Sequence, residues 1–207
     1  MTDKGPVMLE DDSPDLNKLL RDNPAEISSY LTEKFEENDP EGARTALNVV
    51  FVAQNVQMLA RDAGLRRDAL YRTFGGRIDP QLSRVLKLLA AMNVVPRVVP
   101  AQGGSEVIAT QLTEAFARED PAEAILGLSE LVKSQNVSAL ALELGIMRTT
   151  VYKTFGGSVD PQLNRVLKLF AALQVRLAVE PATPPKIRSS RPKLGRPPKA
   201  QVPEIDE

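Results

Sequence analysis

The side chains that could do chemistry in this chain are carboxylates and bases, because its 207 residues include no Cys and no His. Thiolates and imidazoles are the usual ligands of zinc, copper and haem, and the usual partners in nucleophilic catalysis. Asp and Glu together number 27, but nothing in their spacing places two of them in an apolar cleft. The sequence therefore predicts a protein that is not an enzyme and has no metal or cofactor, with a carboxylate-only enzyme as the remaining catalytic alternative.

Basic residues are concentrated in separate segments, although the formal net charge is -1. Residues 46–100 carry about +5 and residues 129–180 about +2. Residues 1–45 and 101–128 are acidic, with about -7 and -4. A local basic face attracts phosphate groups whatever the total charge, so this pattern is compatible with a polyanionic partner.

The sequence contains no apolar run of about 18 residues, the length that a membrane helix needs. The acidic residues 1–23 also lack the apolar core of a signal peptide, and without Cys no disulfide can form. We therefore expect a cytoplasmic protein with no membrane partner.

An internal repeat covers most of the chain. At an offset of about 81 residues, roughly half of the positions from Leu31 to Val98 are identical in a gapless alignment. This period exceeds the 20 to 50 residues of solenoid repeats, which indicates two domain-sized copies. The predicted divisions are an acidic N-terminal segment (1–23), a first domain (24–100), a linker (101–105), a second domain (106–181) and a disordered basic tail (182–207).

Each copy is predicted to be helical. Asp-Pro pairs at residues 39–40 and 120–121 are typical of an N-cap followed by proline, and the pairs at 79–80 and 160–161 repeat that signal. Apolar residues recur at helical spacing after these starts, which predicts about five helices in each copy and an all-α fold class. The short β-branched runs 94–99 and 175–179 allow one closing strand in each copy, and Pro96 restricts the first to an edge.

The segment between Asn55 and Gly75 predicts two short helices joined by a turn at Gly64. Asn55 and its counterpart Asn136 are expected to cap the first helix of each pair, and Tyr71 and Tyr152 are expected to lie in the core with Phe74 and Phe155. The second helix of each pair would then face solvent. Its outward residues are Arg66, Arg67, Asp68 and Arg72 in the first copy, and Met147, Arg148, Thr149 and Lys153 in the second.

Residues 59–74, with the sequence LARDAGLRRDALYRTF, resemble the helix-turn-helix of the Cro/repressor class. More narrowly, they resemble the addiction-module antidote proteins, which are the antitoxin halves of bacterial toxin–antitoxin pairs. The resemblance covers both repeats, about three quarters of the chain. It implies two tandem five-helix Cro/repressor-like domains with disordered termini. Two departures are that Arg66 and Met147 replace the usual hydroxyl cap of the recognition helix, and that the family usually has one copy.

The resemblance implies that the second helix of each pair lies in the major groove of double-stranded DNA. Arg67 and Arg148 would then bind guanine, Arg66, Asp68 and Thr149 would read neighbouring bases, and Arg72 and Lys153 would reach bases or phosphate. Because Arg66, Asp68 and Arg77 become Met147, Thr149 and Ser158, the copies should read unequal half-sites. The candidates for phosphate contacts are Asn55, Asn136, Arg84, Lys87, Arg165 and Lys168.

The tail from Ser190 to Lys199 resembles an AT-hook, in which Lys193 and Arg196 would enter an A·T-rich minor groove. A basic segment that only adds solubility or localisation is the alternative. Together the patterns predict a nucleoid-associated transcriptional regulator that is an intramolecular pseudo-dimer, with further association into a homo-oligomer left open. It would be an antitoxin and autorepressor if it has a small toxin as its partner. The other interpretation is a protein-interaction module that binds a toxin or another partner without reading DNA.

Overall fold

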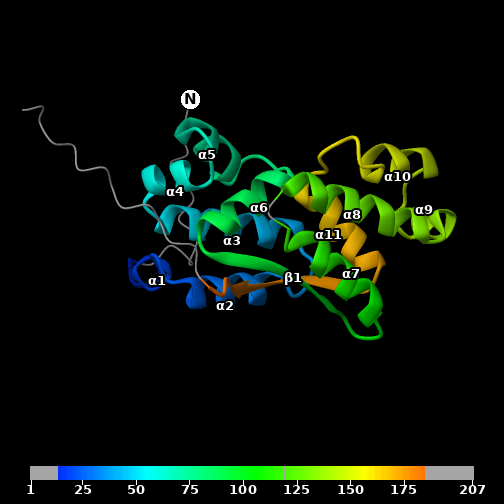
Figure 1. Cartoon of the computed structure of the whole chain (residues 1–207), viewed down its shortest axis with the longest axis horizontal. Coiled ribbons are helices and arrows are strands. Elements are labelled where there is room, and N and C mark those ends of the chain that lie inside the picture. The colour runs from blue at the N-terminus through cyan, green and yellow to red at the C-terminus, as the bar shows by residue number, and fades with distance from the viewer. Residues whose placement is uncertain (1–13, 119, 185–207) are drawn as a thin grey trace, which may run out of the picture.

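The computed structural model describes residues 14–118 and 120–184, which form eleven helices and two strands (Figure 1). The first helix is α1 (Pro14–Leu20), and the first copy continues with α2 (Pro24–Phe35), α3 (Pro40–Ala53), α4 (Val56–Asp62), α5 (Arg67–Phe74), α6 (Leu82–Ala91) and β1 (Val94–Pro100). The second copy consists of α7 (Glu106–Phe116), α8 (Pro121–Ser134), α9 (Val137–Glu143), α10 (Arg148–Phe155), α11 (Leu163–Ala172) and β2 (Val175–Pro181). None of the helices in this described part is long and apolar enough to cross a membrane.

Most of the predicted helix starts are confirmed. The side chains of Asp39 and Asp120 accept hydrogen bonds from the first-turn N–H groups of α3 and α8, and a proline opens each helix. Asn55 and Asn136 cap α4 and α9 in the same way. These side chains pair N–H groups that the helix itself leaves without a partner.

Helix α1 corrects the prediction of a disordered N-terminus for residues 14–20. Leu20 is buried, and Gln54 at the end of α3 donates from Nε2 to the Leu20 carbonyl at 2.9 Å. The Arg21 guanidinium donates to the carbonyl of Ala53 at 3.2 Å. α1 thus adds an apolar turn to the surface of α3 and α2, which contact it.

The predicted closing strands are present, and they pair with each other across the repeat. β1 and β2 form one antiparallel two-stranded sheet, in which Val94 lies opposite Pro181 and Pro100 lies opposite Val175. The outer edges are closed by two equivalent threonines. Thr113 Oγ1 in α7 accepts from Val98 N at 2.9 Å and donates to Val98 O, and Thr32 in α2 makes the same two bonds with Val179.

Replacing Thr32 or Thr113 with valine is expected to lower the free energy of unfolding by about 1 to 3 kcal/mol, because the strand N–H loses its acceptor at a partly buried position. Urea unfolding of each variant measures the change. Thr110→Val, at an exposed position of α7, is the control and should leave the free energy of unfolding within about 0.5 kcal/mol of the parent. Equal effects at positions 110 and 113 would contradict the edge-closing role.

The two copies exchange their last helix and strand. α6 contacts α8 of the second copy, and α11 contacts α3 of the first. β1 packs on α7 and β2 packs on α2. The buried side chains form one continuous cluster, in which Leu88 of α6 and Phe170 of α11 are completely buried. Each packing unit therefore takes elements from both sequence repeats.

The exchange explains why the Asp-Pro pairs at 79–80 and 160–161 do not start helices, which corrects the prediction from the sequence. α6 and α11 begin two residues later, and their N-caps Gln81 and Gln162 make no side-chain cap bond. Asp160 instead accepts from Ser83 N at 3.2 Å and from Ser83 Oγ at 2.6 Å in the other copy. Asp79 accepts from Asn164 N at 3.2 Å, so each aspartate caps the helix of the opposite copy.

These two cross-copy caps are not equal. Asp79 Oδ2 is buried and has no hydrogen-bond partner among the described residues, and burial raises the pKa of this carboxyl. The raised pKa means that the folded chain binds the proton more tightly than the unfolded chain does. Ionised Asp79 therefore costs stability at neutral pH, and this cost disappears as the pH falls through its folded pKa.

Asp79→Asn is therefore expected to keep the free energy of unfolding at pH 7 within about 0.5 kcal/mol of the parent or to raise it, since the amide oxygen can still accept from Asn164 N. Asp160→Asn should cost about 1 to 2 kcal/mol because it weakens both bonds from Ser83. Urea unfolding at pH 7 and at pH 4.5 measures both variants. A larger loss for Asp79→Asn than for Asp160→Asn at pH 7 would contradict this ranking.

Candidate nucleic-acid interface

Each copy presents a pair of short helices joined by a tight turn, α4 with α5 and α9 with α10. Gly64 has φ +63°, and the N–H of the following Leu65 donates back to Ala60 O at 2.9 Å. Gly145 repeats this turn with φ +64°, and Ile146 N donates to Ala141 O at 3.0 Å. The positive φ favours glycine, and the small alanines leave room for the second helix to approach.

The inner face of α5 and α10 is apolar, but the two tyrosines do not belong to it. Leu70 and Phe74 are buried in the first copy. The prediction that Tyr71 and Tyr152 are core residues is wrong, since they are 47% and 44% exposed. Tyr71 follows Leu70 by one position, which rotates its side chain about 100° around the helix and out of the core.

Tyr71 connects the core to the outer face of α5. Its ring and that of Phe51 in α3 form a T-shaped pair, with ring centroids 5.4 Å apart and an interplanar angle of 82°. The Arg67 guanidinium lies 5.6 Å from the centre of the same ring. A cation over an aromatic face is held there electrostatically, so Tyr71 restricts the directions that Arg67 can take.

The start of α5 is strongly basic and open to solvent. Arg66, Arg67, Asp68 and Arg72 are all exposed, as the sequence predicts for outward positions. Arg66 Nε lies 3.0 Å from Asp68 Oδ1, and the hydrogen bond from Arg66 lowers the pKa of Asp68. Arg66 occupies the N-cap position without capping the helix through its side chain. The Arg66 guanidinium therefore hydrogen-bonds to the Asp68 carboxylate and makes no capping hydrogen bond at the start of α5.

The start of α10 has the same backbone and a less polar surface. Met147 is the N-cap residue, again without a side-chain cap bond, and Arg148 is the first helical residue. Arg148, Thr149 and Lys153 are exposed. Within residues 14–118 and 120–184, neither of these two bases forms a salt bridge, so both are available to an anion.

The predicted phosphate contacts divide into three groups. Lys87, Arg165 and Lys168 are exposed. Arg84 is partly buried and donates to Gln81 Oε1 and Thr73 Oγ1, each at 3.3 Å. The side-chain oxygens of Asn55 and Asn136 are already occupied by their own helices. Lys193 and Arg196 of the predicted AT-hook lie outside the described residues.

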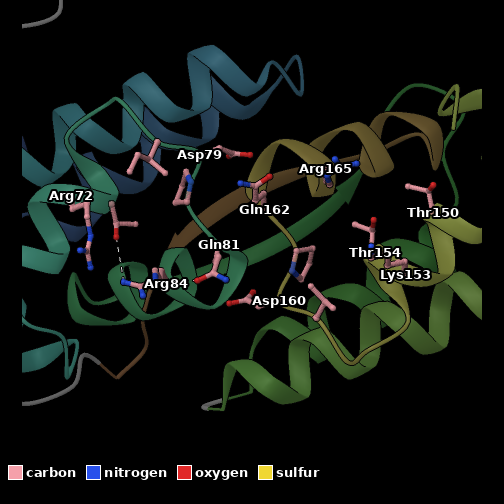
Figure 2. Close-up of a pocket in the computed structure, with 15 residues that line it drawn as sticks. Arg72, Asp79, Gln81, Arg84, Thr150, Lys153, Thr154, Asp160, Gln162 and Arg165 are labelled. Atoms are coloured by element: carbon pink, nitrogen blue, oxygen red, sulfur yellow. Dashed lines mark hydrogen bonds between the residues drawn. The ribbon is translucent and has the colours of Figure 1, made fainter.

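A groove of about 680 Å³ connects the two helix pairs at the centre of the molecule. It is lined by matched residues of both copies, and Figure 2 shows Gln81 and Gln162 near its middle, with Arg72 toward one side and Thr150 and Lys153 toward the other. Backbone bonds from Leu82 N to Pro161 O and from Leu163 N to Pro80 O, both 2.8 Å, hold the copies together here. Four bases line the groove, namely Arg72, Arg84, Lys153 and Arg165.

The groove is a feature that the sequence did not predict. The sequence motif that belongs to the groove is the repeated Asp-Pro-Gln at residues 79–81 and 160–162. By itself this motif matches the start of a helix, so it did not indicate a groove. Only the contact between the copies brings both repeats of this motif to one place, where Gln81 and Gln162 form an isolated antiparallel bridge. The groove therefore extends the candidate interface from two separate helices to one surface.

Helices α5 and α10 lie toward opposite ends of the molecule on the side away from the β-sheet, as Figure 1 shows. The contacts between the copies are made chiefly by the two strands, which pair with each other and pack on α2 and α7, and also by α6 with α8 and α11 with α3. Arg67 and Arg148 are therefore neither buried nor enclosed between the copies. A long anionic partner lying over this side would meet both helices and the groove between them.

Comparison with known proteins matches the chain to one family twice. A family model described as a probable addiction module antidote protein matches residues 12–100 and, a second time, residues 102–181. An uncharacterized protein of Haemophilus influenzae is 36% identical over 69 residues, which cover 33% of this chain and 71% of that protein. No solved structure shows a significant match to the chain. Because the two matches together cover most of the sequence, the chain belongs to the family of probable addiction module antidote proteins.

Proposed function

We propose that this chain is a sequence-specific DNA-binding regulator of an addiction module. α4–α5 and α9–α10 act as two helix-turn-helix units of the Cro/repressor class, with α5 and α10 as the recognition helices. The observation that supports this most directly is the exposure of an arginine at the first position of both helices, on one side of a molecule whose two copies share a core. The chain is then a pseudo-dimer within one polypeptide, which needs no second subunit to present two reading helices.

The proposed roles follow from position on the helix. Arg67 and Arg148 stand where the N-terminal end of a recognition helix meets base edges, and a guanidinium matches O6 and N7 of guanine. Arg72 and Lys153, five residues later on each helix, line the central groove with Arg84 and Arg165. These four bases would bind phosphates between two half-sites that lie about 34 to 36 Å apart along the DNA.

Membership of the family also favours a toxin as a second partner. The support for a toxin partner is that the matching family model is described as an antidote. In that case the regulator is an antitoxin that represses its own gene, acts without catalysis and is found in the cytoplasm at the nucleoid. Co-expression with the product of the neighbouring gene tests this part. A stable complex with a small basic protein supports it, and the absence of any complex leaves DNA binding as the function.

Titration onto labelled DNA from the region upstream of the gene, and onto scrambled DNA of equal length, tests DNA binding. Repeating both titrations over a salt series gives the number of phosphates contacted, because the logarithm of the affinity falls with a slope of about -0.9 per neutralised phosphate. Tighter binding to the upstream sequence with a steep slope supports the proposal. Undetectable binding to both DNAs would contradict it and favour the interaction module.

Deleting residues 185–207 is expected to reduce the salt slope by a few units while the preferred sequence stays the same. The deleted segment contains six bases, including Lys193 and Arg196, and an AT-hook-like strand in the minor groove would bind mainly through charge. The same titrations measure both quantities. A change in the preferred sequence would show that the tail reads bases as well as phosphates.

A further inference from the structure

The two candidate recognition helices begin with the same backbone and different chemistry. The N-cap residues Arg66 and Met147 have φ -71° in both copies, with ψ 143° and 147°. The next residues, Arg67 and Arg148, are identical. Differences in what the two helices bind must therefore come from side chains on a shared frame. The residues on either side of this arginine differ between the copies, as do Ala69 and Thr150, Leu70 and Val151, and Arg72 and Lys153.

In the first copy the neighbours of Arg67 form a charged unit. Arg66 lies 3.0 Å from Asp68, and both side chains are well exposed. A carboxylate that holds a guanidinium directs its remaining N–H groups outward, which favours hydrogen-bonded contacts to base edges and phosphates. This end of α5 has no apolar side chain exposed to solvent among residues 66–68.

In the second copy the same positions are apolar or uncharged. Met147 is 76% exposed, and Thr149 replaces the carboxylate of Asp68. Leu142 of α9, where the first copy has Arg61, is 84% exposed, so the change extends across the helix pair. Among base edges in the major groove, only thymine offers an apolar group, its 5-methyl, and both a thioether and a threonine methyl can pack on it.

We propose that the chain binds DNA in one fixed direction on a non-palindromic site, in which the second copy recognises thymine methyl groups through Met147. The first half-site is then recognised by hydrogen bonds from Arg66 and Arg67, and the second by Arg148 together with apolar contact. This inference rests on the proposed function and goes beyond it, because DNA binding alone is equally compatible with a symmetric site. A single chain with two unequal helices has no symmetry that would require a palindrome.

The test begins with duplexes selected from a random library by the full-length protein. In synthetic copies of the selected duplex, each thymine is replaced by uracil, which removes the methyl group and leaves the hydrogen-bonding edge unchanged. We expect at least one replacement, in one half of the site only, to weaken binding about fourfold, the value of one buried methyl or methylene group. The same replacement should have no effect on the affinity of Met147→Ala. Val107→Ala, at a 66% exposed apolar position of α7, is the matched control and should keep the full uracil effect.

A second variant transfers the chemistry of the first copy to the second. Met147→Arg combined with Thr149→Asp is expected to select a site whose two halves are more alike than those of the parent. Met147 does not cap α10 through its side chain, and both residues are exposed, so the fold should be retained. Thermal unfolding of the double variant checks this directly.

The outcomes separate the inference from the function on which it rests. A palindromic site selected by the parent chain would overturn the inference and leave the proposed DNA binding intact. An asymmetric site in which uracil has the same effect with Met147→Ala as with the parent would overturn the role of Met147, and the exposed Met147 and Leu142 would then belong to a protein-binding surface. No enrichment of any sequence from the library would overturn the proposed function itself.

Discussion

Replacing both Arg67 and Arg148 with alanine is expected to abolish the preference for the upstream DNA while the protein stays folded. A bidentate arginine–guanine pair contributes about 1 to 3 kcal/mol of discrimination, so the two together account for about 2 to 6 kcal/mol. Both side chains are exposed, and the double substitution removes the cation–π interaction between Arg67 and Tyr71. An exposed interaction of this kind contributes about 0.5 to 1 kcal/mol to stability.

The matched control removes two arginines from other surfaces. Arg97 pairs with Glu180 in the β-sheet, and Arg118 pairs with Glu123 at the start of α8. Arg97→Ala with Arg118→Ala changes the formal charge by the same amount, and loss of exposed ion pairs costs at most about 1 kcal/mol each. This control should keep the sequence preference. Equal loss of preference in both double variants would mean that charge alone, and not reading by α5 and α10, explains the binding.

Cutting the chain between Gln102 and Gly103 is expected to leave neither half able to fold as a monomer. β1 then has no partner strand, and the apolar faces of α6 and α11 are separated from the helices α8 and α3 on which they pack. An isolated helix or strand of this length is marginal in water. Mixing the two halves, 1–102 and 103–207, should restore the fold because the exchanged elements meet again in a complex.

Circular dichroism melting and sedimentation of each half, and of the mixture, measure this effect. Insertion of six Gly and Ser residues at the same place is the control. It lengthens the connection without separating the copies and should cost only about 1 kcal/mol, since loop-closure entropy grows slowly with length. A half that is monomeric and unfolds cooperatively by itself would contradict the exchange. A half that forms a homodimer would agree with it, because each copy could then take the exchanged helix and strand from a second molecule.

Much of the local structure was predictable from short motifs. The caps at Asn55 and Asn136 and the turns at Gly64 and Gly145 depend on hydrogen bonds between residues at most five positions apart. Such bonds are determined by a few neighbouring residue types, and the repeat presents each of them twice. The outward positions of α5 and α10 follow directly from these helix boundaries.

Predictions from the sequence were wrong where one sequence pattern is compatible with two structures. Asp79-Pro80 matches a helix start, but the aspartate caps a helix of the other copy. Tyr71 carries an apolar ring on an amphipathic helix, and in the structure this ring contacts Phe51 while the residue stays 47% exposed. α1 is too short for periodicity to identify, and its stability comes from contacts with α2 and α3.

The sequence by itself determined that this protein has two similar helical copies, where most of their helices begin, and which basic residues face outward at the start of α5 and α10. The tertiary structure alone decided that α6–β1 and α11–β2 exchange between the copies, and that a groove lined by four bases lies between α5 and α10. The physical reason is that the apolar stripes of α6 and α11 are nearly identical, so burial against either copy removes the same surface from water. Chain connectivity and packing geometry determine which copy each helix packs on, and neither can be predicted from a local sequence pattern.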